Sequence, residues 1–270
     1  HDRMAHTGMM RYEEGTPKIP AAAMSNPDAD LINAMLKRDP NITLSLNMTS
    51  ENLGIATSYN VIAEVTGSSK PDEIVLIGAH LDSWDEGTGA IDDGAGVAIV
   101  TTAAKLIQDL PQKPARTIRV VLYAAEEVGL VGGKAYAAQH ADELDKHYIA
   151  AESDFGAGPV YKIDFNVNAA TFEQVKQEHS AMMLNGVELG NNEASGGPDV
   201  SILPALGVPV ASLNQDGTDY FDYHHTPNDT LDKIDPKKLA QSAAAYAQFA
   251  YMMAQSEIDL RPVTQQKEQR

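Results

Sequence analysis

The stretch Ile74-Val75-Leu76-Ile77-Gly78-Ala79-His80-Leu81-Asp82 joins a continuous apolar run to an imidazole and a carboxylate. Four consecutive large apolar residues favour a short strand that is buried on both faces. Similar apolar runs follow at 117–125, 148–152 and 208–213, and stretches with helical spacing lie between them. Strands that alternate with helices predict an α/β fold, with a mostly parallel mixed sheet and helices on both faces.

The remaining elements follow from the same periodicities. Helices are predicted at 25–37, 94–110, 131–144, 171–184 and 199–206 and from Asp235 onward, and further strands at 42–48 and 60–65. No repeat or linker interrupts the pattern, so residues 21–258 are expected to form one domain. We expect residues 1–20 to be an N-terminal tail, the remnant of an upstream domain, and residues 259–270 to be a polar C-terminal tail.

Composition excludes several classes of protein. The 270 residues carry 38 acidic and 20 basic side chains, a formal net charge of -18, which argues against nucleic acid or an anionic membrane as partner. There is no cysteine, and therefore no disulfide framework, thiolate metal site or cysteine nucleophile. No apolar run approaches the roughly 20 residues that a membrane span needs.

Polar side chains collect directly after the predicted buried strands. They are His80 and Asp82 after the first, Glu126 and Glu127 after the second, Glu152 and Asp154 at the end of the third, and His224 and His225 beyond the fourth, with Asp92 and Asp93 in the loop after the first strand. The carboxyl ends of parallel strands share one edge of a sheet, which is where ligands bind in such folds. So many carboxylates in one place would repel each other without cations.

The types of side chain indicate which metal would bind. Imidazole and carboxylate without thiolate suit zinc, with manganese or cobalt as alternatives. The supply of groups is sufficient for two ions bridged by a carboxylate. A calcium-binding loop is the obvious alternative at 82–87, but its third position is Trp84 rather than Asp or Asn.

Five motifs, in order along the chain, carry a resemblance to a known family. They are Gly78–Ser83, Gly89–Gly96, Ala125–Glu127, Glu152–Asp154 and His225-Thr226. With them the chain resembles the co-catalytic zinc aminopeptidase family, which includes bacterial leucyl aminopeptidases and glutamate carboxypeptidases. It is most similar to the plasma glutamate carboxypeptidase (carboxypeptidase Q) type. The resemblance implies the zinc-aminopeptidase, phosphorylase/hydrolase-like fold and a catalytic metallopeptidase domain at 21–258.

The resemblance implies a role for each matching residue. One zinc would be held by His80, Asp92 and Asp154, and a second by Asp92, Glu127 and His225. Glu126 would be the general base. A cis peptide bond is implied between Asp92 and Asp93.

Two supporting roles are also implied. The Asp82 carboxylate would accept a hydrogen bond from His80 and so fix its tautomer. Members of the family often place an oxyanion-donating tyrosine where this chain has His224, which makes His224 the candidate substrate-binding residue. Asp93 could be functional or only a helix cap, and Glu152 is interpreted as structural.

The predicted function is a two-zinc exopeptidase that hydrolyses the peptide bond after a free N-terminal residue of dipeptides or short peptides. A non-catalytic receptor-like domain and a one-metal aminoacyl cyclotransferase on the same fold remain alternatives. A short peptide with a free N-terminus is the expected partner. A homodimer and a secreted or periplasmic location are expected from the resemblance.

Overall fold

The computed structural model describes residues 3–178 and 186–261, and its centre is a mixed sheet. Within these residues the sheet has seven strands in the order β1-β3-β2-β4-β7-β5-β6. The strands are β1 (Val61–Val65), β2 (Lys70–His80), β3 (Arg116–Tyr123), β4 (His147–Glu152), β5 (Val160–Asn166), β6 (Glu188–Leu189) and β7 (Val210–Gln215). β3, β2, β4 and β7 are parallel neighbours, whereas β1 and β5 run antiparallel to β3 and β7. The predicted mostly parallel mixed sheet is confirmed.

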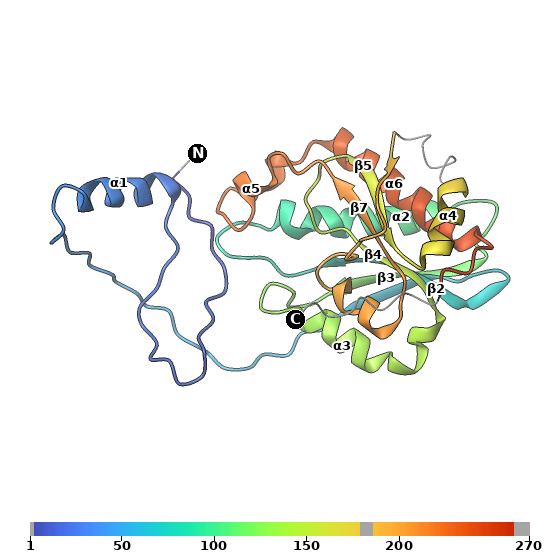
Figure 1. The fold of residues 1–270 in the computed structure, drawn as a ribbon, viewed down its shortest axis with the longest axis horizontal. Helices are drawn as coiled ribbons and strands as arrows, with labels where there is room; N and C mark the ends of the chain where they lie inside the picture. Colours follow the sequence, from blue (N-terminus) through green and yellow to red (C-terminus); the bar gives the residue numbers. More distant parts are fainter. Residues whose placement is uncertain (1–2, 179–185, 262–270) are drawn as a thin grey trace.

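Helices cover both faces of the sheet, as Figure 1 shows. The longer helices are α1 (Asn26–Leu36), α2 (Ala95–Gln108), α3 (Val131–Gln139), α4 (Ala169–Glu178) and α6 (Pro236–Gln255), and α5 (Tyr220–Tyr223) is a single turn. α2 and α6 pack on one face and α3 on the other. None of the described helices is both long and apolar enough to cross a membrane.

The alternation of side chains along β2 explains the two layers. Val75 and Ile77 face the core formed with Ile99 of α2 and Phe249 of α6. Leu76 faces the opposite core, which includes Tyr136 of α3. Because successive side chains of a strand point to opposite faces, a strand covered by helices on both sides must be apolar throughout. This is the physical reason for the continuous apolar run.

The N-terminal segment stands apart from the sheet. Figure 1 shows α1 and the extended chain on either side of it projecting from the body near α5. α1 begins after Ser25, whose hydroxyl accepts a hydrogen bond from the Asp28 amide, and Pro27 lies in its first turn. The helix contains no buried residue. The domain bounds given above stay a prediction.

Some sequence-based predictions differ from the structure. The strand expected at 42–48 is absent: Leu44 and Leu46 are 64% and 57% exposed, and no strand pairs with them. Alternation alone does not make a strand without a neighbour for its backbone groups. β5 and β6 were missed. The helix expected at 131–144 ends at Gln139 and continues as a 3-10 turn, and the segment 199–206 forms two 3-10 turns. Of the helix predicted at 171–184, residues 179–184 lie outside the described residues, as does most of the predicted C-terminal tail.

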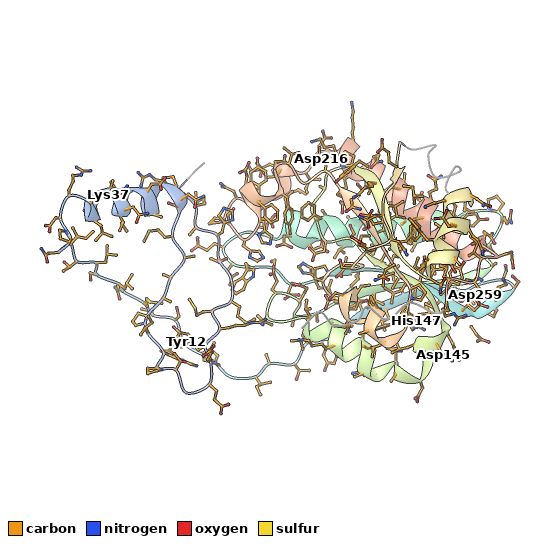
Figure 2. All side chains as sticks on the ribbon, viewed as in Figure 1. Tyr12, Lys37, Asp145, His147, Asp216 and Asp259 are labelled. Carbon is orange, nitrogen blue, oxygen red and sulfur yellow. The ribbon has the colours of Figure 1, made fainter. Side chains whose placement is uncertain are left out.

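A buried histidine lies at the amino end of β4. His147 is fully buried, donates from Nδ1 to the Glu143 carbonyl (2.9 Å), and accepts at Nε2 from the Tyr136 hydroxyl (2.8 Å). Burial lowers the pKa of His147 to about 4, and nearby Arg119 and His140 also disfavour its cation. Figure 2 labels His147 at the end of the body remote from α1.

Replacing His147 with glutamine should flatten the pH dependence of stability. The folded state keeps His147 neutral, so the stability it contributes is present above its unfolded pKa of about 6.5 and is lost as the pH falls toward 4. Between pH 7 and pH 5 the wild type should lose about 2 kcal/mol more unfolding free energy than His147→Gln. Urea denaturation of both proteins at the two pH values measures this difference. The contributions of the other titrating groups are the same in both proteins and cancel in the comparison. Equal losses would contradict the assignment.

Candidate metal centre

The polar residues singled out in the sequence meet at the carboxyl edge of the sheet. His80 ends β2, Glu126 and Glu127 follow β3, Asp154 follows β4, Asp92 lies in the turn before α2, and His224 and His225 follow α5. Asp92, Glu126, Glu127, Asp154, His224 and His225 line one cavity of about 410 Å³. Parallel strands deliver these groups to one place although they are far apart in the chain.

The first group of possible metal ligands contains His80, Asp92 and Asp154. Nε2 of His80 lies 3.1 Å from Oδ1 of Asp92 and 3.5 Å from Oδ1 of Asp154. One donor atom from each residue fits within 4.8 Å of the other two, so a single ion can contact all three. His80 and Asp92 are buried, which keeps water from screening their charges.

The second group surrounds the other oxygen of Asp92. Nε2 of His225 lies 3.1 Å from Oδ2 of Asp92 and 3.0 Å from Oε2 of Glu127. Nε2 of His224 lies 3.4 Å from the same Asp92 oxygen, and the two histidine rings stack with centroids 3.5 Å apart. Asp92 therefore contributes one oxygen to each group. Either His224 or Glu127 could be the third member of the second group.

The tautomers of both histidines indicate that a cation belongs here. His80 donates from Nδ1 to the Asp82 carbonyl (2.9 Å), and His225 donates from Nδ1 to the Thr7 carbonyl (2.9 Å). In the neutral tautomer each Nε2 then directs a lone pair at carboxylate oxygens of Asp92. Acceptors that face each other repel unless a proton or a metal ion lies between them. The donor set therefore fits divalent cations.

The electrostatics lead to the same conclusion. Burial alone would lower the pKa of His80, but the Asp154, Asp82 and Asp92 carboxylates raise it far above its usual value. The pKa of His225 is raised to about 10 by Asp92 and Glu127 against the effect of burial. Without a metal the site would attract protons strongly, and a dication can replace them.

Asp82 lies beside His80, where the resemblance implies it, and also has a second set of contacts. Nδ1 of His80 lies 3.7 Å from the nearer Asp82 carboxylate oxygen but 2.9 Å from the Asp82 backbone carbonyl oxygen, to which it donates. The carboxylate also accepts from the backbone amides of Glu126 (2.9 Å) and Glu127 (3.1 Å). Ala125, directly before them, has a φ of 56°, in the left-handed region. Asp82 thus fixes an unfavourable turn that presents the two glutamates to the cavity.

Glu126 has the properties of a proton acceptor. It lines the cavity, and no hydrogen bond to its carboxylate is found among the described residues. Burial raises the pKa of Glu126 to about 7, and the negative charge of Asp154 adds to the shift. A carboxylate near pH 7 can both take up and release a proton.

The backbone around Asp92 is held by two carboxylates. The peptide bond between Asp92 and Asp93 is cis, as the resemblance implied. Asp229, which is 3% exposed, accepts from the amides of Ile91 (2.5 Å) and Asp92 (3.1 Å). Asp93 accepts from the amides of His80 (3.1 Å) and Gly96 (3.0 Å), so it both caps α2 and positions a candidate ligand. Sequence reasoning missed Asp229, because no local signal connects it with a turn 137 residues earlier.

Aromatic side chains complete the cavity, and sequence reasoning missed these too. Phe155, Tyr220 and Phe221 line it. The rings of Phe155 and Tyr220 stack with centroids 4.7 Å apart. Glu152, interpreted as structural, is buried, lines a neighbouring cavity with Asp154 and Phe155, and accepts from the Val200 amide (3.2 Å). The cavity lining therefore combines aromatic rings with four carboxylates, which we call the acidic floor: Asp92, Glu126, Glu127 and Asp154.

Comparisons with known proteins agree with this geometry. The mouse and human carboxypeptidase Q sequences are each 37% identical, over 250 and 255 residues that cover 92% and 93% of this chain. Those alignments cover 53% of each relative, so the chain spans about half the length of the curated relatives it matches.

Solved structures share the fold. The crystal structure of a peptidase M28 precursor from Shewanella amazonensis SB2B is 72% identical with a TM-score of 0.96, and the match covers 98% of this chain and 60% of that one. An aminopeptidase from Aneurinibacillus sp. strain AM-1 is 27% identical with a TM-score of 0.62, covering 89% and 59%.

A family model gives the assignment. The model described as "Peptidase family M28" matches residues 60–250, which include every candidate ligand. The resemblance to zinc aminopeptidases and to carboxypeptidase Q is confirmed. The chain belongs to peptidase family M28.

Proposed function

We propose that this chain is the catalytic part of a two-zinc exopeptidase, which hydrolyses the peptide bond after a free N-terminal residue of dipeptides or short peptides. One zinc would be held by His80, Asp92 and Asp154, and the other by Asp92, Glu127 and His225. The observation that carries the proposal is that both Asp92 oxygens face an imidazole Nε2, at 3.1 Å each. Manganese or cobalt would fit the same donors.

The alternatives require fewer intact groups. A one-metal cyclotransferase needs only one ligand group, and a receptor-like domain needs neither metals nor a base. The chain retains both ligand groups and a carboxylate with a raised pKa beside them. This completeness favours the peptidase.

The chemistry would be shared between the ions and Glu126. When bound, two divalent cations acidify a water molecule and polarise the scissile carbonyl. Glu126 accepts the proton of the attacking water at its carboxylate and delivers it to the nitrogen of the leaving amine. Asp82 keeps Glu126 in place through the backbone amides. Each turnover thus returns Glu126 to its ionised state.

The acidic floor suits a substrate amine. Glu126 and Asp154 line the cavity together, so a protonated N-terminus would be attracted there. We assign His224, also in the lining, to substrate contact near the reacting carbonyl. Its stacking on His225 fixes its ring beside the second ligand group. Export from the cytoplasm and homodimer formation stay predictions.

A panel of dipeptides tests the reaction class. Dipeptides with a free N-terminus should be hydrolysed, and their N-acetylated forms should not, because acetylation removes the charge that the acidic floor attracts. A chelator should abolish turnover, and zinc should restore it. Elemental analysis should find about two zinc ions per chain. One ion or none, together with no hydrolysis, would favour the alternatives.

Glu126→Gln should retain the metals and lose catalysis. The amide is nearly isosteric but cannot accept the proton of water, so kcat should fall by at least about 100-fold. Zinc content and thermal midpoint should match the wild type. Glu193→Gln, an exposed residue outside the cavity, is the matched control and should keep full activity. Near-normal kcat in Glu126→Gln would disprove the base assignment.

Asp229→Ala should weaken metal binding without touching a ligand. Loss of the carboxylate that accepts from the Ile91 and Asp92 amides would free the turn that carries Asp92, and zinc affinity should fall about 10- to 100-fold. Competition with a fluorescent chelator measures this change. Asp229→Asn keeps one acceptor oxygen, so its zinc affinity should lie between those of the wild type and Asp229→Ala. Asp232→Ala, an exposed aspartate of the same loop, should bind zinc normally. Unchanged affinity in Asp229→Ala would refute the positioning role.

A further inference from the structure

The N-terminal segment is attached to the loop that carries His225. The Thr7 amide and hydroxyl donate to the His225 carbonyl (2.9 and 3.1 Å), and His225 Nδ1 donates to the Thr7 carbonyl (2.9 Å). His6 Nδ1 donates to the His224 carbonyl (2.8 Å). Four hydrogen bonds therefore hold residues 6–7 against a candidate metal ligand more than 200 positions later. They attach the segment that carries Arg11 to the loop beside the cavity.

Arg11 is the residue that this attachment brings to the cavity. It lines the same 410 Å³ space as Asp92, Glu126, Glu127 and Asp154. Its Nη2 atom lies 3.9 Å from the position that a Cβ on Gly129 would occupy. Gly129 belongs to the turn after Glu126, so the guanidinium lies over the segment that presents the base.

Arg11 places a positive charge in a cavity lined by carboxylates. Among the described residues that line the cavity, Arg11 is the sole lysine or arginine. Its side chain is exposed, and no hydrogen bond or ion pair to it is found within residues 3–178 and 186–261. In a chain with 38 acidic side chains, four carboxylates share its cavity without pairing with it. The guanidinium is therefore free to bind an anionic group of a ligand.

The chemistry of the substrate supplies such a group. A guanidinium binds a carboxylate through two parallel hydrogen bonds. Two bound divalent cations would offset the four carboxylates of the cavity, which leaves Arg11 as the charged group that can bind the carboxylate of a dipeptide. Two extended residues span at most roughly 7 Å, and one cavity of this size can hold both ends of a dipeptide.

We propose that Arg11 binds the free α-carboxylate of the substrate and so distinguishes a dipeptide acid from its amide. This inference rests on the proposed function, because the reacting bond must lie between the amine at the acidic floor and the carboxylate at Arg11. In a longer peptide the carboxylate would lie farther from the scissile bond, and Arg11 would meet a neutral peptide group instead.

The test compares leucyl-glycine with its C-terminal amide. The wild type should show a higher kcat/KM for the free acid than for the amide. In Arg11→Gln the acid-to-amide ratio should fall about tenfold, through KM of the acid, which corresponds to the loss of one charge-assisted pair. Arg38→Gln removes the same charge from an exposed site outside the cavity and should leave the ratio unchanged.

Binding to catalytically impaired protein separates this inference from the proposed function. Calorimetry with zinc-loaded Glu126→Gln and Glu126→Gln/Arg11→Gln should give the same tenfold change in the ratio of Kd values. An unchanged ratio in both assays overturns the role of Arg11. An equal change in Arg38→Gln also overturns it, because net charge would then explain the effect. If Arg11→Gln changes the acid-to-amide ratio of Kd values but the wild type shows no turnover, the carboxylate-binding role of Arg11 is supported and the peptidase function is rejected.

Discussion

The structure depends on one electrostatic constraint, which is the buried carboxylate of Asp92 between two imidazoles. Each Asp92 oxygen lies 3.1 Å from an Nε2 atom whose ring donates its only proton elsewhere. Such an arrangement is repulsive unless a proton or a metal ion lies between the groups. Bound metal ions would therefore stabilise the fold, because they bind only the state in which the candidate ligands meet.

The site is held by backbone hydrogen bonds to side chains that do not touch the proposed ions. Asp82 fixes the glutamate pair, Asp93 receives the His80 amide, and Asp229 receives the amides of the Asp92 turn. Each is a carboxylate that accepts from two backbone N–H groups. These bonds use charges that would otherwise add to the repulsion at the centre. They also position the ligands before metal arrives, which reduces the ordering cost of binding.

Sequence reasoning found the central strands and placed the candidate ligands at one edge of the sheet, because both rest on local signals. A strand buried on two faces must be apolar throughout, and polar residues just beyond it must lie at the sheet edge. It failed where the cause is tertiary. The alternation at 42–48 finds no neighbouring strand, and the hydrogen bonds of the Asp82 carboxylate to amides 44 and 45 residues later were missed. Asp229 and Thr7 act through contacts to residues 137 and 218 positions away, which one sequence does not reveal.

The charges that line the cavity support the proposal of a short substrate. Four carboxylates and one guanidinium line the same cavity, so groups of both signs can contact one small molecule. A zwitterion with its amine toward the carboxylates and its carboxylate toward Arg11 is favoured at both ends, whereas the reverse orientation is opposed at both ends. The same N-terminal segment orients His225 through Thr7 and supplies Arg11. The proposed metal ligand and the proposed substrate contact are therefore connected through one short stretch of chain, outside the residues that form the sheet.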